Sequence, residues 1–367
     1  MNVHKLSSER VAAPVVGTSL NFEHSIHSFG DAIVKTRTMR ALDNAACRYP
    51  VYRTIRCAAR RKLEDIFDDV ALHSGLSAHR LREATLLLEG ADIFIQADGW
   101  RTATYSSCVF SVWASSLARI AEMRDKLFEL VGERYPRHCM FTLDWNYMSA
   151  HGLGSTSFDE LVTDAIYDES YPILGEPVRN FVARYLDANE TVLVLLGAPG
   201  TGKTRLVRAI LGAMSDRKEE AAKVMYTADK KALENDEIFV DFITGSHDAF
   251  VIEDADHLLL ARSGGNHDLH RFLMIADGVV RAQGRKIIFT TNLPNVLDID
   301  DALTRPGRCY AIRNLRNLTP EEARTLARRI CAADMERAAR AETGLFATPA
   351  KSYSVAQVWR ACGATSG

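Results

Sequence analysis

The sequence lacks the features that mark membrane, exported and disulfide-bonded proteins. No segment of its 367 residues approaches the roughly 18 consecutive apolar residues that span a bilayer, and residues 1–20 contain no apolar signal-peptide core. The seven cysteines are an odd, widely spaced set without a C-x-x-C pair, so no ligand spacing supports a disulfide framework or a zinc site. We therefore expect a cytoplasmic protein with reduced thiols and no membrane partner.

A strong net charge is also missing. The 45 Lys and Arg residues nearly balance the 47 Asp and Glu residues, so global charge selects no class of partner. Residues 35–62 are the local exception, with nine basic residues against the single acid Asp43. A nucleic-acid contact is one interpretation of this segment. A solvated or oligomer-contacting face, balanced by the acidic stretch at residues 64–69, is the favoured one.

The length predicts two domains. We expect residues 1–30 to form a tail or docking arm and residues 31–165 to form an N-terminal α+β domain. Within that domain, strand-like runs alternate with helical periodicity over residues 116–131. Its aromatic residues are interpreted as packing residues; they include Trp113, Trp145 and Tyr147.

Residues 197–204 read Gly-Ala-Pro-Gly-Thr-Gly-Lys-Thr and directly follow the apolar run at residues 192–196. This is a complete phosphate loop, in which backbone N–H groups surround a phosphate, Lys203 adds a positive charge and the Thr204 hydroxyl ligates Mg²⁺. Helix-forming residues follow, so the phosphates would lie at a helix N-terminus. The sequence therefore predicts ATP and Mg²⁺ as cofactors. The expected nucleotide contacts are Gly197, Ala198, Pro199, Gly200, Thr201, Gly202, Lys203, Thr204 and Arg205.

Two further apolar runs end in polar residues. Residues 249–252 lead into Glu253 and Asp254, and residues 286–291 lead into Asn292. Carboxyl ends of parallel strands meet at one edge of a sheet, so these side chains are expected near the phosphates. We expect Glu253 to hold Mg²⁺ together with Thr204, and Asp254 to polarise the attacking water. The alternatives are plain surface acids for the first pair and a turn-forming residue for Asn292.

The order Glu253 then Asp254 departs from the usual Asp then Glu. Asp254 is one methylene shorter than Glu, which predicts slow hydrolysis or a displaced water, because in-line attack tolerates little misplacement. Further along, Arg305 and Arg308 flank a Pro-Gly turn. An arginine supplied by a neighbouring subunit can stabilise the transferring phosphoryl group, whereas arginines taken alone are more often surface charges.

In this order, the four motifs resemble those of the AAA+ ATPases, and within them the AAA clade proper, over about residues 171–362. The segments 251–254, 273–279 and 289–293 are most similar to the AAA translocase that carries folded Rieske protein across the inner mitochondrial membrane. The resemblance implies an α/β P-loop NTPase with a parallel sheet at residues 166–317. It also implies a small helical lid at residues 318–367. The lid opens with the capping box Thr319-Pro320-Glu321-Glu322, and its first helix is expected to run to about Arg340.

The resemblance further implies a homo-oligomeric ring of six or seven subunits, in which Asn292 senses the γ-phosphate and Arg305 and Arg308 reach a neighbour's nucleotide. It predicts an ATP hydrolase that remodels a folded protein or protein complex, with residues 1–165 choosing the client. No aromatic-hydrophobic-Gly tripeptide follows residues 224–227, so threading of unfolded chain is not expected. Two alternatives stay open: a slow ATP-dependent assembly switch, and a nucleic-acid-linked AAA+ motor or loader.

Overall fold

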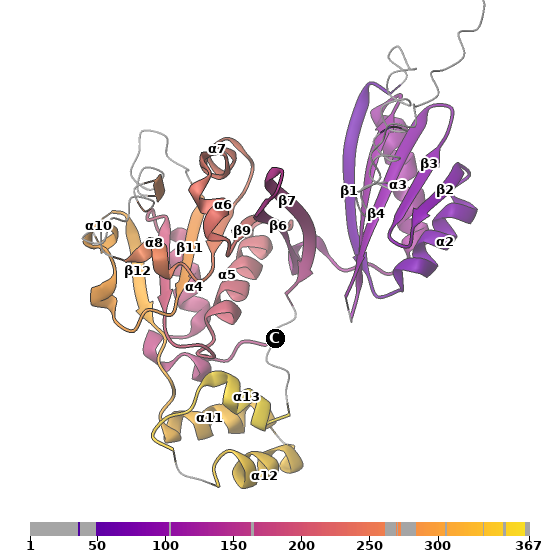
Figure 1. Cartoon of the computed structure of the whole chain (residues 1–367). Helices are drawn as coiled ribbons and strands as arrows, with labels where there is room; N and C mark the ends of the chain where they lie inside the picture. The colour runs from indigo at the N-terminus through magenta and orange to yellow at the C-terminus, as the bar shows by residue number, and fades with distance from the viewer. Residues whose placement is uncertain are drawn as a thin grey trace, which may run out of the picture. The chain divides into compact units, whose positions relative to one another are not determined.

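A computed structural model describes residue 36 and residues 49–102, 104–162, 165–260, 269, 271–272, 284–304, 307–332, 334–347 and 350–363. The chain divides into two compact units, Met1–Arg134 and Tyr135–Gly367, which are described separately (Figure 1). The tail expected at residues 1–30 lies outside the described residues. Within the described part, none of the helices combines the length and apolarity needed to cross a bilayer.

The first unit is an antiparallel sheet covered by two helices. Its elements are β1 (Val51–Ala59), α2 (Leu63–His73), β2 (Ser77–Arg82), β3 (Thr85–Glu89), β4 (Ile93–Arg101), β5 (Ser106–Ala114) and α3 (Leu117–Val131). The strand order is β1-β5-β4-β3-β2, and α2 and α3 bury their apolar residues in one core on the same side of the sheet. Helix α3 begins after Ser116, whose hydroxyl accepts a hydrogen bond from the Arg119 N–H.

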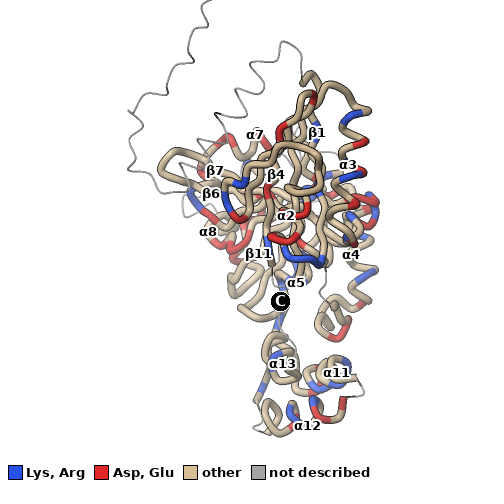
Figure 2. The backbone as a smooth tube through the Cα atoms, turned by 90° about the vertical axis from the view of Figure 1, so that its right-hand side faces the viewer, with Lys and Arg blue, Asp and Glu red and all other residues tan. Residues whose placement is uncertain are grey.

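One base in the described part of the basic segment pairs with the acidic stretch that follows the segment. Arg61 forms an ion pair with Asp69, 2.5 Å apart, and donates to the Leu130 carbonyl. Figure 2 shows Lys and Arg alternating with Asp and Glu along α3 as well. These contacts favour a balanced face over a nucleic-acid patch. Residue 35 and residues 37–48 of the same segment lie outside the described residues.

The second unit contains a seven-stranded sheet in the order β12-β8-β11-β10-β9-β6-β7. Its strands are β6 (Met140–Ser149), β7 (Gly152–Leu161), β8 (Val192–Leu196), β9 (Ala222–Thr227), β10 (Ala249–Ile252), β11 (Lys286–Thr291) and β12 (Cys309–Asn314). All neighbouring strands are parallel except β6 and β7. The phosphate loop follows β8, which lies between β12 and β11 and is fully buried. This is the α/β P-loop fold that the sequence predicts.

Helices cover both faces of this sheet. They are α4 (Val178–Asp187), α5 (Lys203–Lys218), α6 (Lys230–Glu234), α7 (Asp236–Thr244), α8 (Asp256–Leu259) and α10 (Asp301–Thr304), with short 3₁₀ turns at Arg137–Cys139, Asp168–Ser170, Pro172–Leu174 and Val296–Asp298. Along β8, Leu193 and Leu195 join the core beneath α4 and α5, whereas Val192 and Val194 join the core beneath α6, α7 and α8. The continuous apolar run of β8 therefore reflects burial on two faces.

The hairpin β6–β7 differs from the expected domain organisation. The sequence placed the domain boundary near residue 165, but the compact units divide at residue 134, and β6 pairs in parallel with β9. A short apolar run carries no signal of its pairing partner, which long-range packing decides. Trp145 and Tyr147 on β6 are 46% and 36% exposed, so they are not core residues, but their rings pack edge to face with centres 5.9 Å apart.

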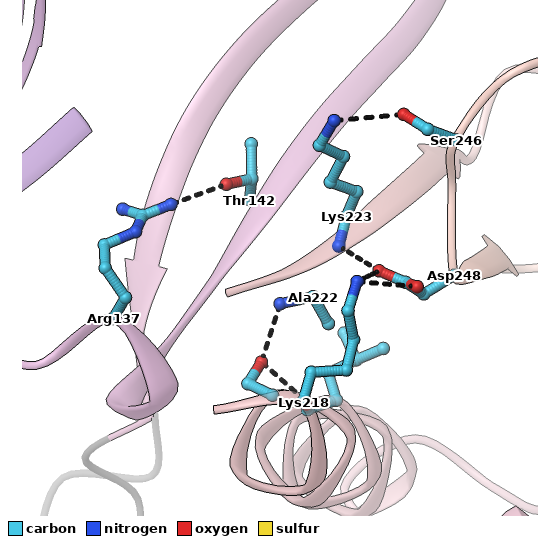
Figure 3. Close-up of polar contacts among 9 residues, drawn as sticks. Arg137, Thr142, Lys218, Ala222, Lys223, Ser246 and Asp248 are labelled. Atoms are coloured by element: carbon cyan, nitrogen blue, oxygen red, sulfur yellow. Dashed lines mark hydrogen bonds and ion pairs between the residues drawn. The ribbon is translucent and has the colours of Figure 1, made fainter. Parts of the chain in front are cut away.

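Polar contacts, the most buried of them at Asp159, hold this hairpin and the adjacent strands in register. Asp159 of β7 is 0% exposed; it accepts from Arg137 at 3.0 Å and from the Thr142 hydroxyl at 2.6 Å. Arg137 also donates to Thr142 (Figure 3). Beyond β9, Asp248 accepts from Lys218 at the end of α5 and from the Lys223 backbone N–H (Figure 3).

The helical lid contains α11 (Pro320–Cys331), α12 (Met335–Gly344) and α13 (Val355–Ala361). The predicted capping box is present: Thr319 accepts from the Glu322 N–H, and Glu322 accepts from the Thr319 N–H. The single helix expected to reach Arg340 is instead two helices. The chain leaves α11 at Ala332, which has a left-handed φ of 48°, and Asp334 caps α12.

Asp159→Ala is expected to destabilise the second unit by about 3 kcal/mol, because it leaves a half-buried guanidinium without its carboxylate. Asp187→Ala is the matched control, since it breaks an exposed ion pair with Arg217 and is expected to cost about 1 kcal/mol at most. Chemical denaturation followed by circular dichroism measures both. Equal losses for the two variants would contradict the role assigned to Asp159.

Candidate functional site

The phosphate loop is shaped by close backbone approaches that only glycine permits. Gly197 has a φ of 149°, and a Cβ there would lie 2.1 Å from the Leu315 carbonyl oxygen. Gly202 has a φ of 94°, and its carbonyl accepts a hydrogen bond from the Tyr171 hydroxyl at 3.0 Å. Inside the loop, the Thr201 hydroxyl donates to the Ala198 carbonyl at 2.8 Å. The loop is therefore held in its curved form by the protein itself.

Lys203 is the first residue of α5, and its side chain folds back into the loop. Its ammonium group donates to the carbonyls of Gly197 at 2.6 Å and Ala198 at 3.2 Å, and to Asn292 Oδ1 at 2.8 Å. Burial lowers the pKa of Lys203, and the nearby carboxylates of Asp254, Asp256 and Glu253 oppose this shift. A bound phosphate would oppose it further.

Glu253 lies where β10 ends and is held by two hydroxyl groups. Thr204 donates to its Oε1 at 2.9 Å, and Tyr226 of β9 donates to its Oε2 at 2.9 Å. The sequence predicted the pairing of Thr204 with Glu253 but not the contact with Tyr226. A hydroxyl and a carboxylate are oxygen ligands of the kind that Mg²⁺ prefers. Among the described residues no three His, Cys, Asp or Glu side chains gather as a metal site, so Mg²⁺ here would depend on phosphate and water oxygens as well.

Asn292 connects the lysine to the second acid. Its amide nitrogen donates to Asp254 Oδ1 at 2.9 Å, while its amide oxygen accepts from Lys203. Asp254 has a left-handed φ of 51°, which turns the chain directly after Glu253. Asp256, which the sequence analysis did not assign, accepts from the Asn292 backbone N–H at 2.8 Å and from the Thr291 hydroxyl. Its only sequence signal is its place as the third acid of Glu-Asp-Ala-Asp.

The lid closes one side of the site. A cavity of about 440 Å³ is lined by loop residues, by Glu253, Asp254 and Asn292, and by three residues of α13: Val355, Ala356 and Trp359. The Ala356 N–H donates to the Gly200 carbonyl at 3.0 Å. Arg205, expected to contact nucleotide, lines this cavity, but its guanidinium lies 3.8 Å from the Trp359 ring centre. Tyr167 also stacks on Trp359, so aromatic contacts tie the lid to α5 and to the segment before α4.

Arg308 directly precedes β12, at the end of the sheet where the parallel strands begin, whereas the phosphate loop lies where they end. Its carbonyl accepts from the N–H of Val192, the first residue of β8, and its guanidinium donates to the Ala302 carbonyl at 3.0 Å. The five residues of β8 separate this end of the sheet from the phosphate loop by about 16 Å. An extended arginine side chain is shorter than that distance. Arg308 therefore does not reach Lys203 of its own chain. Arg305 lies outside the described residues.

Comparison with known proteins agrees with this geometry. Residues 193–317 match the family described as "ATPase family associated with various cellular activities (AAA)". A stretch of 132 residues is 33% identical to the ATP-dependent zinc metalloprotease FTSH 11, chloroplastic/mitochondrial, of Arabidopsis thaliana, and covers 32% of this chain. The match spans only 15% of that protein. The chain thus contains an AAA ATPase domain. The resemblance to the Rieske-protein translocases gains no support from these matches.

The lowered pKa of Lys203 predicts that the protein takes up protons when it binds ATP. In alkaline solution the lowered pKa makes part of the Lys203 population neutral, and phosphate favours the charged form, so ATP binding should take up a fraction of a proton. At lower pH, where Lys203 is charged with or without phosphate, the uptake attributed to Lys203 should vanish. Titration calorimetry in buffers of different ionisation enthalpy measures the uptake.

Lys203→Arg is the control for this measurement, since a guanidinium stays charged throughout. The variant should bind ATP without the alkaline proton uptake. An alkaline uptake that is the same in the variant and the wild type would assign the proton to another group.

Proposed function

We propose that this chain is a Mg²⁺-dependent ATP hydrolase of the AAA+ type that works as a homo-oligomeric ring in the cytoplasm and remodels a folded protein or protein complex. The observation that carries the proposal is the convergence of Lys203, Thr204, Glu253, Asp254 and Asn292 around one cavity at the carboxyl ends of β8, β10 and β11. The match of residues 193–317 to the AAA family supports it.

Each residue has a role that follows from its contacts. Lys203 and the loop N–H groups would bind the phosphates, exchanging the carbonyl contacts of the ammonium for phosphate oxygens. Thr204 and Glu253 would hold Mg²⁺, which neutralises charge on the phosphates when bound. Asp254 would accept a proton from water, and Asn292 would orient that water beside the γ-phosphate.

A ring explains why Arg308 lies far from its own phosphate loop. A guanidinium that cannot reach the nucleotide of its own chain can reach one bound to a neighbour, where it would stabilise charge on the transferring phosphoryl group. Such a contact is heterologous, joining different surfaces of two copies, and closes into a ring when the rotation permits. We propose the same role for Arg305.

The segment after β9 supports a folded client rather than a threaded one. In this segment Asp229 caps α6 through the Lys231 N–H and also accepts from the Met148 N–H of the β6–β7 hairpin, at 2.8 Å. The segment is therefore a capped helix fixed to the hairpin, and it carries no aromatic-hydrophobic-Gly loop. We propose that the first unit selects the client.

One observation favours a second candidate, the slow assembly switch. The Asp254 carboxylate is short, and one of its oxygens accepts from Asn292, which reduces its freedom to activate water. In this case ATP would stabilise a complex and hydrolysis would be slow. Tight ATP binding with almost no turnover in the wild type would favour the switch over the remodelling ATPase.

Mixing two inactive variants tests the shared site. Lys203→Ala is expected to lose ATP binding, and Arg308→Ala is expected to bind ATP but lose turnover by about 10³-fold or more. In an equimolar mixture, a subunit with Lys203→Ala supplies an intact Arg308 to a neighbour whose loop is intact. Random assembly should therefore restore about a quarter of wild-type turnover per subunit.

The control for mixing is each variant alone at the same total concentration. Wild-type turnover per subunit should also rise with protein concentration until the ring is assembled. Normal turnover by Arg308→Ala alone, or a mixture as inactive as its components, would contradict the trans role of Arg308.

A further inference from the structure

We infer that Tyr226 is a positioning residue that fixes the orientation of the Glu253 carboxylate toward Mg²⁺. The inference rests on the proposed ATPase function. Tyr226 does not line the nucleotide cavity, and no sequence motif marks it. It acts through Glu253, whose Oε2 accepts from the Tyr226 hydroxyl while Oε1 accepts from Thr204.

The strand register explains how the two side chains meet. Strands β9 and β10 are parallel, with Tyr226 paired to Val251, and the Glu253 N–H donates to the Thr227 carbonyl. Side chains two residues apart on a strand share a face, so Glu253 projects to the same side as Val251. That side is the α5 face, where Val251 and Tyr226 pack together. The tyrosine hydroxyl therefore approaches Glu253 from beside it on the sheet.

A second cavity, of about 330 Å³, shows why this hydroxyl matters. It shares Thr204 and Glu253 with the nucleotide cavity, and Tyr226 lines it too. Its other walls are mostly apolar: Phe141, Leu143, Trp145, Phe158, Val207, Leu211 and Val251. Arg208, a cation in the same wall, donates to Glu160 and to the Leu161 carbonyl. Glu253 thus borders a mostly apolar cavity, and Tyr226 in the wall of that cavity donates to Oε2 of Glu253.

The Tyr226 side chain is a phenol, whose hydroxyl donates a hydrogen bond to Oε2 of Glu253. Removing this hydroxyl would leave Oε2 without its tyrosine donor and free the carboxylate to rotate. Partners that orient a metal-binding group typically contribute 10–100-fold to metal affinity or activity.

The test compares ATP binding in Mg²⁺ with ATP binding in EDTA for the full-length wild type and Tyr226→Phe. The phenylalanine keeps the aromatic ring in the wall of the second cavity and removes only the hydroxyl. We expect the apparent Mg²⁺ affinity of the ATP complex to fall by about 10-fold or more. ATP affinity in EDTA should stay within about twofold, since the phosphate loop is unchanged.

Tyr185→Phe is the matched control. The Tyr185 hydroxyl is buried in the same unit, but it donates to the Thr191 and Ile287 carbonyls, at the end of the sheet where the parallel strands begin. This variant should leave the Mg²⁺ response unchanged even if its thermal stability falls. Thermal unfolding of both variants separates a loss of stability from a loss of metal positioning.

Each other outcome overturns the inference in a distinguishable way. A wild-type Mg²⁺ response in Tyr226→Phe would refute the positioning role and leave the proposed function intact. An equal loss of response in both tyrosine variants would mean that the effect is structural. If the wild type binds ATP with the same affinity in Mg²⁺ and in EDTA, both this inference and the proposed Mg²⁺-dependent ATPase function are refuted.

Discussion

The charge of Lys203, held inside a curved loop, is the interaction on which the second unit depends. An ammonium group taken out of water is costly unless other groups compensate for the lost hydration. Here the carbonyls of Gly197 and Ala198 and the amide oxygen of Asn292 supply that compensation. The loop can curve this tightly because its glycines accept left-handed φ values and close backbone contacts. A phosphate would replace the same contacts, so the loop is already organised for an anion.

Strand order converts this local feature into a site. With β8 between β12 and β11, and β10 beyond β11, the carboxyl ends of three strands bring Lys203, Glu253 and Asn292 to one edge. Two peripheral elements then act on that edge. The lid contacts it through the stack of Arg205 on Trp359, and the strand β9 contacts it through a tyrosine hydroxyl. The proposed nucleotide site at this edge is therefore physically connected to the lid and to the sheet beside it.

Much of the chemistry could be predicted from sequence because it is encoded locally. The loop at residues 197–204 specifies its own curvature and the start of α5. The apolar runs that lead into Glu253 and Asn292 predict buried parallel strands. The capping box at Thr319 likewise fixes the start of α11. In each case neighbouring residues form the hydrogen bonds or backbone angles that define the feature, so no distant partner is needed.

Only the tertiary structure decided the features that need a distant partner. Because β6 pairs with β9, the β6–β7 hairpin belongs to the second unit and not to the predicted N-terminal domain. A short apolar strand can pair with any exposed strand at the edge of a sheet, so the sequence does not specify its partner. The contacts of Tyr226, Asp256 and Arg205 depend on side chains that lie 27 to 154 residues away in the chain. Periodicity and motifs report only local geometry. The sequence by itself thus determined the phosphate loop and its acids, whereas long-range packing determined which groups orient them.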